Sequence, residues 1–253
     1  MKKFGLIFRI VSIIFIIGCC LFYGGRLVYY YDKLKPKKVN GEVVEYIAQT
    51  IKRDNGIAYE NEGLYMMGSD FVFKGNVKSN YVSYSDKLWR VVKINSDGSI
   101  RLVLDSAATA SVYSYTDVIY ETSEVYNYLI NDFSSQLIDS DKYLADFTVC
   151  SDIVTDLTNI SCDKKIEKQK VGLVSVEDFT GSLLNEKSYF NSESAIWMIN
   201  SSDEKQMWVV YNSKLSKVSI NERYGVRPII VLNSNVKIKS GEGTNSNPYV
   251  LEV

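Results

Sequence analysis

Apolar positions dominate the first thirty residues. Residues 10–25 carry no charged side chain, and apolar residues continue on both sides over residues 4–31. A helix needs about twenty mostly apolar residues to cross the hydrocarbon core of a bilayer, and this stretch is long enough if Arg9 and Arg26 extend toward the headgroups. The tyrosines at 29–31 suit the membrane interface. The pattern predicts a cytoplasmic stub and a transmembrane signal-anchor over residues 1–31.

Two other interpretations of this segment stay open. It is also compatible with a cleaved secretory signal peptide, or with a lipoprotein signal in which Ile16-Ile17-Gly18-Cys19 directs lipidation to Cys19. A cleavable signal normally ends in small residues followed by a polar start of the mature chain. Here Cys20-Leu21-Phe22-Tyr23 keeps the helix apolar beyond any cut, which favours the anchor.

A short basic linker is expected at residues 32–39, and a helix at residues 40–56. Asn40 is a suitable N-cap, Asn55-Gly56 provides a left-handed stop, and apolar residues recur between them every three to four positions. These apolar residues are Val43, Val44, Ile47, Ala48 and Ile51. Their stripe would dock on the following domain or pair with a second copy of the chain.

From Gly63 onward, short β-type runs alternate with turn residues, which is typical of a strand-rich α+β domain. The clearest signal is a hairpin, in which residues 88–94 and 99–104 flank the turn Asn95-Ser96-Asp97-Gly98 and Gly98 suits a positive φ. Further strands are expected at residues 71–73, 81–84, 171–174, 196–199, 207–211, 226–232, 236–238 and 249–252.

Two helices are predicted among these strands. The first begins at Thr122 or Ser123 and runs to residue 137, because apolar side chains repeat every four positions at 125, 129, 133 and 137. The second runs from Ser175, which forms a capping box with Asp178, to Leu184.

Composition limits what this domain can be. The chain has 253 residues, 46% of them hydrophobic, which suffices for one substantial core after the anchor. Residues 57–253 are therefore expected to form one extracytoplasmic α+β domain. The net charge of −1 gives no basic field for nucleic acid, and the aromatic content of 13% argues against disorder.

The orientation of the anchor is inferred from the cysteines. Basic residues flank the apolar segment on both sides, so the positive-inside rule gives no decision. Beyond the anchor the chain holds only Cys150 and Cys162. Such a pair is most simply one disulfide, which places the domain in an oxidising, extracytoplasmic compartment. Two unpaired thiols or half of a metal site are the alternatives, although the chain has no histidine and the pair lacks CxxC spacing.

Several short motifs occur in a recognisable order. They are Asn80-Tyr81-Val82, Leu88-Trp89-Arg90-Val91-Val92, Asp97-Gly98, Tyr128-Leu129-Ile130-Asn131, Val171-Gly172-Leu173, Glu177-Asp178-Phe179, Gly225-Val226-Arg227-Pro228-Ile229-Ile230, Ser240-Gly241-Glu242-Gly243-Thr244 and Asn247-Pro248-Tyr249. Over residues 63–253 the chain thereby resembles an uncharacterised family of membrane-anchored extracytoplasmic domains of low-GC Gram-positive bacteria.

That family is distantly similar to the C-type-lectin-like fold of formylglycine-generating enzymes. The resemblance implies a single-pass protein of the cell membrane, with residues 225–232 as a central core strand. It does not carry over an activity: the enzymes use a cysteine pair late in the domain, whereas no cysteine follows Cys162 here. The calcium-ligand motifs of C-type lectins are absent too, and Asn247-Pro248-Tyr249 is only weakly similar to them.

Individual side chains support two interpretations each. Trp89, Trp197 and Trp208 could stack on a sugar or peptide, but their apolar neighbours favour core packing. Arg227 could bind an anion, but in a buried strand it would pair with a structural carboxylate. The pair Glu177-Asp178 could serve acid–base chemistry, yet carboxylates in a first helical turn favour the helix dipole.

The function expected from these observations is non-catalytic binding of a protein, peptide or cell-envelope glycan through polar loops, with no cofactor. The loops are residues 107–121, 185–195, 200–205 and 212–225, and the candidate contacts are Tyr113, Tyr115, Trp197 and Arg227. One alternative is a carboxylate-based envelope hydrolase. Another is a structural subunit that assembles through the helix at residues 40–56. The sequence does not settle the oligomeric state.

Overall fold

The computed structural model of the protein describes residues 18–19, 21, 23–25, 37–39, 42–191 and 194–252. The chain divides into two compact units, Met1–Val44 and Glu45–Val253. The predicted anchor lies mostly outside the described residues, of which Gly18, Cys19, Leu21 and residues 23–25 are helical. Within the described residues, no helix is long and apolar enough to cross a membrane.

In the first unit, the described residues include a small antiparallel hairpin of β1 (Lys37–Val39) and β2 (Glu42–Val44). Two predictions are therefore wrong: residues 37–39 are a strand rather than linker, and residues 42–44 are not helical. The physical reason lies in the sequence. Asn40-Gly41 is a dipeptide typical of two-residue hairpin turns, and the β-branched pair Val43-Val44 favours a strand.

The helix predicted at residues 40–56 is correspondingly shorter. Helix α2 spans Ile47–Asn55, has Tyr46 rather than Asn40 as its N-cap, and ends as predicted at Gly56, whose φ is 62°. Ile47 and Ile51 have no exposed surface. The part of the predicted stripe that lies on α2, Ile47, Ala48 and Ile51, is thus buried inside the second unit, which begins at residue 45 rather than 57, and these three side chains are not free to pair with a second copy.

The second unit is a mixed, strand-rich domain with few helices, which confirms the predicted fold class in its coarse form. Its larger sheet has nine strands in the order β11-β16-β7-β6-β5-β18-β17, with β4 added beside β6 and β3 beside β4. These strands are β3 (Gly63–Met67), β4 (Asp70–Lys74), β5 (Tyr81–Tyr84), β6 (Lys87–Ile94), β7 (Ile100–Leu104), β11 (Gly172–Leu173), β16 (Pro228–Leu232), β17 (Ile238–Ser240) and β18 (Tyr249–Leu251).

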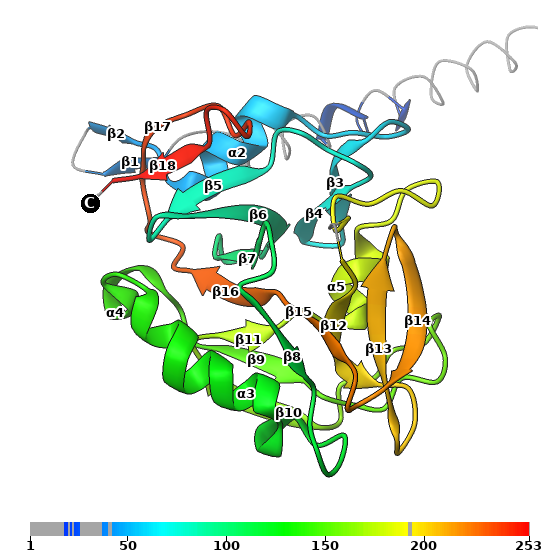
Figure 1. The fold of residues 1–253 in the computed structure, drawn as a ribbon. Coiled ribbons are helices and arrows are strands. Elements are labelled where there is room, and N and C mark those ends of the chain that lie inside the picture. The colour runs from blue at the N-terminus through cyan, green and yellow to red at the C-terminus, as the bar shows by residue number, and fades with distance from the viewer. Residues whose placement is uncertain are drawn as a thin grey trace, which may run out of the picture. The chain divides into compact units, whose positions relative to one another are not determined.

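The β6–β7 hairpin lies in the middle of this sheet (Figure 1). It confirms the clearest sequence prediction, since Ile94 pairs with Ile100 across the turn and Gly98 has a φ of 89°. Asp97 Oδ1 accepts hydrogen bonds from the backbone N–H (2.8 Å) and the hydroxyl (2.7 Å) of Ser99. Turn chemistry and strand pairing therefore agree.

A second sheet of five strands has the order β14-β13-β12-β15-β8. Its strands are β8 (Thr109–Val112), β12 (Ile196–Ser201), β13 (Gln206–Tyr211), β14 (Lys214–Ser219) and β15 (Arg223–Val226). The predicted loop 212–225 is consequently wrong over most of its length, whereas the predicted loop 107–121 is a strand only at residues 109–112. The lysines and serines of β14 looked like a solvated loop because an exposed edge strand carries the same polar residues.

The predicted central strand at residues 225–232 is divided between the two sheets. β15 pairs with β8 and β12 of the smaller sheet, and β16 pairs with β7 and β11 of the larger one. Arg227 stands between them. One mostly apolar run therefore passes from one sheet to the other, which hydrophobic periodicity alone does not predict.

The helix predicted from residue 123 to 137 is confirmed in extent but is not a regular α-helix. It continues from α3 (Glu124–Tyr128) through a π-helical turn, η2 (Leu129–Phe133), into a 3-10 turn, η3 (Ser134–Gln136). A strict four-residue repeat drifts by about 40° per repeat around an α-helix of 3.6 residues per turn. The wider π turn reduces this drift, and Val125, Leu129 and Phe133 are all fully buried.

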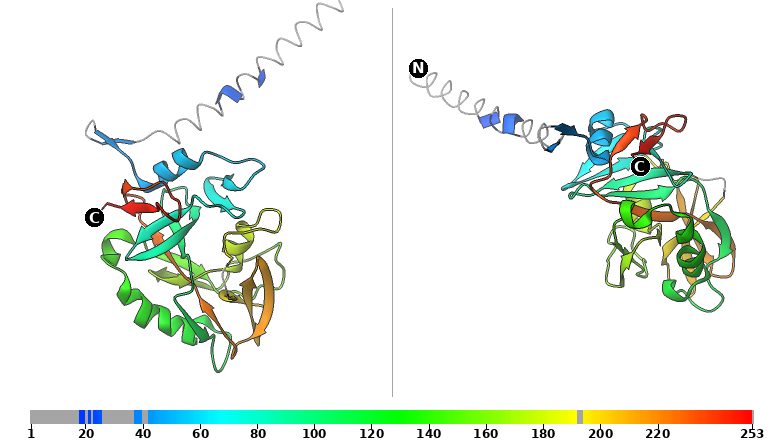
Figure 2. Two further views of the ribbon diagram at one scale, coloured as in Figure 1. Left: turned by 45° about the horizontal axis from the view of Figure 1, so that its top comes forward. Right: turned by 90° about the vertical axis from the view of Figure 1, so that its left-hand side faces the viewer.

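Shorter elements complete the unit. They are η1 (Tyr120–Thr122), α4 (Ser140–Tyr143), the paired strands β9 (Phe147–Cys150) and β10 (Lys165–Gln169), and α5 (Val176–Gly181). In the three views of Figures 1 and 2, α3 lies on the side of the unit away from β3 and β4. Helix α5 contacts β12.

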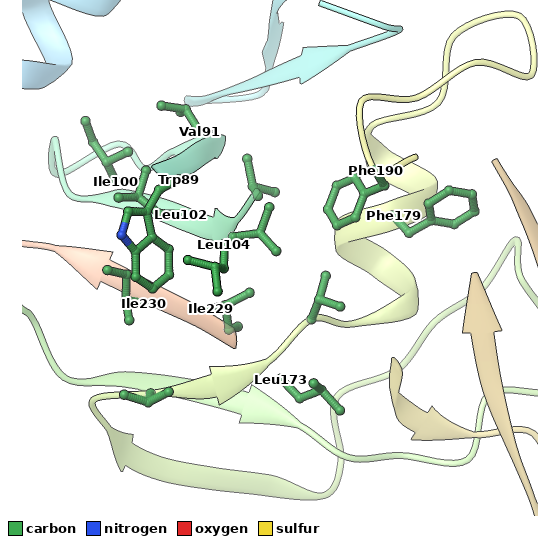
Figure 3. Packing of buried hydrophobic residues seen from close by; sticks show 14 of the residues in the cluster. Trp89, Val91, Ile100, Leu102, Leu104, Leu173, Phe179, Phe190, Ile229 and Ile230 are labelled. Atoms are coloured by element: carbon green, nitrogen blue, oxygen red, sulfur yellow. The ribbon is translucent and has the colours of Figure 1, made fainter. Parts of the chain in front are cut away.

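One contiguous core joins these elements, and Figure 3 shows its side chains from β6, β7 and β16 gathered together with Phe179 of α5 beside Phe190. The rings of Phe179 and Phe190 meet edge to face, with centroids 6.0 Å apart. Trp89 and Trp197 have no exposed surface and Trp208 is 8% exposed. The interpretation of all three tryptophans as core residues is confirmed.

Candidate functional site

The candidate site is a hollow of about 410 Å³ that is lined by residues of both sheets and of α5. We call it the α5 hollow. Its charged lining consists of Asp70, Lys93, Arg101, Glu177 and Asp178. Its apolar lining includes Val72, Val92, Val149, Leu173 and Ile199. The volume falls within the range of small-molecule sites, about 300–1,000 Å³.

Two of the carboxylates in the α5 hollow are engaged by cations. Lys93 Nζ lies 2.8 Å from Asp70 Oδ2. Arg101 forms an ion pair with Asp178, in which Nη2 donates to Oδ2 at 2.9 Å and Nε lies 2.8 Å from Oδ1 without hydrogen-bond geometry. The Arg101–Asp178 pair is well shielded, at 16% and 10% side-chain exposure, so solvent ions screen its attraction less than that of a surface pair.

Asp178 has a further role at the start of α5. Its Oδ2 accepts hydrogen bonds from the backbone N–H (3.0 Å) and hydroxyl (2.8 Å) of Ser175, whose Oγ in turn accepts from the backbone N–H of Asp178 (3.0 Å). This is the predicted capping box, and it is confirmed. The neighbouring Glu177 is exposed, so the structure gives the two adjacent carboxylates different surroundings.

The cysteine pair borders the same hollow. Cys150 and Cys162 form a disulfide with their Cα atoms 5.1 Å apart, as predicted, and Cys150 lines the hollow. Asn200 Nδ2 donates to the carbonyl oxygens of Cys150 (3.1 Å) and Asp152 (3.2 Å). The disulfide closes the loop covalently, and the hydrogen bonds of Asn200 tie the loop to β12.

Three of the four predicted contact residues are not at the surface. Tyr113, Trp197 and Arg227 have no exposed area, whereas Tyr115 is 72% exposed. Trp197 Nε1 donates to the carbonyl of Ser111 (2.8 Å), and its ring meets that of Tyr113 edge to face at 5.5 Å. The three buried residues therefore cannot touch a ligand from the folded surface, because each is enclosed by core contacts.

Arg227 does not pair with a carboxylate as predicted. Its Nε donates to the carbonyl of Leu104 (2.7 Å) and its Nη1 to that of Phe190 (2.9 Å). Burial lowers the pKa of its guanidinium to about 10, against the opposing field of Asp105. The group remains a cation at neutral pH and acts as a double donor inside the fold.

Lys93 and Arg101, the cations of the α5 hollow, were missed in the sequence. They face each other directly across the β6–β7 hairpin. Like charges at such positions repel, so this register is stable only where carboxylates lie nearby. The sequence analysis predicted both strands but not the register that places these two cations opposite each other.

Comparison with known proteins adds nothing to this geometry: no family model, no curated protein and no solved structure matches the chain. The resemblance to membrane-anchored extracytoplasmic domains, and the similarity to the C-type-lectin-like fold, therefore stay predictions. The candidate site rests on the residues themselves.

Proposed function

We propose that the protein is a membrane-anchored domain of the extracytoplasmic face that binds a protein, peptide or cell-envelope glycan without changing it chemically. The α5 hollow carries this proposal. It combines a buried apolar floor with fixed charged and hydroxyl groups, the composition of sites that orient a ligand through a few polar contacts. Most of its lining comes from strands and a helix, so the site is preformed.

The hollow replaces the polar loops as the place of binding. Residues 107–121 and 212–225 are partly paired strands, which leaves them less freedom to adapt to a ligand. Tyr115 and Ile119 are exposed on one of these segments, at 72% and 51%. They offer isolated apolar side chains rather than an enclosed surface, and such side chains are common on any protein.

The location is proposed from residues 4–31 and from the disulfide. The apolar segment is long enough for a single span, and a disulfide is expected to persist in an oxidising compartment. Cleavage of this segment, or lipidation at Cys19, would leave the second unit on the same side. Protease treatment of intact cells tests the location: digestion only after lysis would contradict it.

A carboxylate-based hydrolase is the second candidate, because three carboxylates line the hollow. Asp70 and Asp178 are each engaged by a cation, which ties them to fixed partners. Hydrolysis of wall glycans or peptides that disappears in Glu177→Gln would support this candidate over binding alone.

The binding proposal is tested with the full chain in detergent, screened against wall glycan fragments and capped peptides. Thr148 is exposed on β9 and lines the hollow, so Thr148→Trp should obstruct the site. Ser216→Trp places the same side chain at an exposed position of β14, outside the hollow. Binding should survive in Ser216→Trp and be lost in Thr148→Trp. If the unmodified chain bound none of these probes, the proposal would be wrong.

A further inference from the structure

The charges that line the α5 hollow do not cancel. It has three carboxylates and two cations, and these form two close pairs, Lys93 with Asp70 and Arg101 with Asp178. Within the described residues, Glu177 is the carboxylate of the hollow without an ion-pair partner. The lining thus carries one uncompensated negative charge.

Geometry makes this single charge decide the sign of the field. In each close pair the opposite charges lie about 3 Å apart, so their fields largely cancel for a ligand group a few ångströms further away. Glu177 is left as the dominant charge. Its position in the first turn of α5 fixes its backbone through the capping box of Ser175 and Asp178.

The rest of the lining is suited to an aliphatic chain. Val92, Val149, Leu173 and Ile199 are at most 4% exposed and form the buried floor. Burial of apolar surface contributes about 25 cal/mol per Å². A ligand segment that combines several methylene groups with a terminal cation would satisfy both the floor and Glu177.

We infer that the α5 hollow, if it is the binding site proposed above, receives a basic side chain of a peptide or protein. The aliphatic stem of a lysine or arginine lies on the valine, leucine and isoleucine floor, and its ammonium or guanidinium group faces the carboxylate of Glu177. Asn95, Thr148 and Thr180 also line the hollow. Asn95 Nδ2 already donates to Ser99 Oγ (2.9 Å) and Thr180 Oγ1 to the carbonyl of Glu177 (3.3 Å), so these two side chains would offer a peptide backbone their oxygen atoms as acceptors.

The test uses four capped tripeptides that differ only in the central residue: lysine, arginine, norleucine and glutamate. Norleucine keeps the aliphatic stem and removes the amine. Binding to the full chain in detergent is measured by saturation-transfer NMR and by titration calorimetry. Glu177→Gln removes the charge at nearly constant size. Glu124→Gln is the matched control, because Glu124 is also an exposed first-turn glutamate, on α3 and outside the hollow.

The lysine and arginine peptides should bind the unmodified chain about three- to tenfold more tightly than norleucine, and the glutamate peptide should be the weakest. Glu177→Gln should remove that preference, Glu124→Gln should leave it intact, and added salt should reduce it. Two results overturn the inference and separate it from the proposed function. Peptide binding that Thr148→Trp blocks but Glu177→Gln leaves unchanged would retain the site and refute its selectivity for cations. Absence of all binding, glycans included, would refute both.

Discussion

The disulfide gives the sharpest stability prediction. Cys150 and Cys162 are separated by 12 positions, and for a loop of this length the chain-entropy model gives about 3 kcal/mol at 25 °C. The hydrogen bonds of Asn200 to the loop remain in the folded state when the link is removed. The double variant Cys150→Ala, Cys162→Ala should therefore lose stability mainly because its unfolded chain gains freedom.

Urea unfolding followed by tryptophan fluorescence measures this loss. All three tryptophans of the chain, Trp89, Trp197 and Trp208, are buried in the second unit, so the signal reports that unit alone. The free energy of unfolding should fall by about 3 kcal/mol, and the dependence on urea should steepen because the unfolded chain exposes more surface.

Two controls make the result specific. Cys19→Ala removes a cysteine of the first unit that is free in the described part of the chain and should leave the transition unchanged. Dithiothreitol should destabilise the unmodified chain to the level of the double variant and have no effect on the double variant itself. A loss below about 1 kcal/mol, or equal sensitivity of both proteins to the reductant, would refute the reasoning.

Three further predictions concern the fold. Ser123→Ala should cost about 1–2 kcal/mol in urea unfolding, because the Ser123 hydroxyl accepts from the backbone N–H of Tyr126 (3.0 Å) at the start of α3; an unchanged midpoint would contradict this. Gly241→Ala should lower the free energy of unfolding by at least about 3 kcal/mol, because the φ of Gly241 is 107° and an added Cβ would lie 2.0 Å from the Pro248 carbonyl oxygen. Gly68 has a φ of 62° and open space around it, so Gly68→Ala should lower the free energy of unfolding by only about 1 kcal/mol. Equal costs would show that the clash is relieved. Alkaline pH should destabilise the protein, because burial raises the pKa of three tyrosines above the ordinary value of 10.0. These are Tyr113, Tyr120 and Tyr189. Their contribution to the free energy of unfolding should be constant below pH 10 and fall as the pH rises above it. Together the three tyrosines lower the free energy of unfolding by about 4 kcal/mol per pH unit. The lowered pKa of Arg227 opposes this by about 1.4 kcal/mol per pH unit. Absorbance at 295 nm should show a group of tyrosines that ionise only with unfolding, and smooth titration of all tyrosines near pH 10 would contradict the prediction.

Local signals predicted the elements in which propensity, turn residues and packing agree. The β6–β7 hairpin, the Gly56 stop and the Ser175 capping box are of this kind. Failures occurred where one residue pattern suits two structures. Val43 and Val44 fit a helical stripe as well as a strand, and β14 has the composition of a solvated loop although it pairs with β13 along its whole length. Only the partner strand decides such segments.

The candidate site was less accessible from the sequence, because its residues come from β4, β6, β7, β9 and α5 and meet only in the fold. Aromatic residues and a buried-strand arginine attracted attention as contacts, yet aromatic residues contribute as much to cores as to binding surfaces. Glu177 and Asp178 were identified as a pair. Their separate roles follow from Arg101 of β7, which forms an ion pair with Asp178 and not with Glu177.

Arg227 lies where the chain passes from the smaller sheet to the larger one. Where the chain passes from β15 to β16, Arg227 donates to two carbonyl oxygens inside the core, that of Leu104 at the end of β7 and that of Phe190 beyond α5. A buried carbonyl oxygen without a hydrogen-bond donor lowers the stability of the fold by about 1–3 kcal/mol. An apolar side chain at position 227 could not donate these hydrogen bonds. The same guanidinium thereby connects β7 with the segment that follows α5. Strand β7 carries Arg101, and helix α5 carries Glu177 and Asp178. Arg227 therefore stabilises the junction between these elements without lining the α5 hollow.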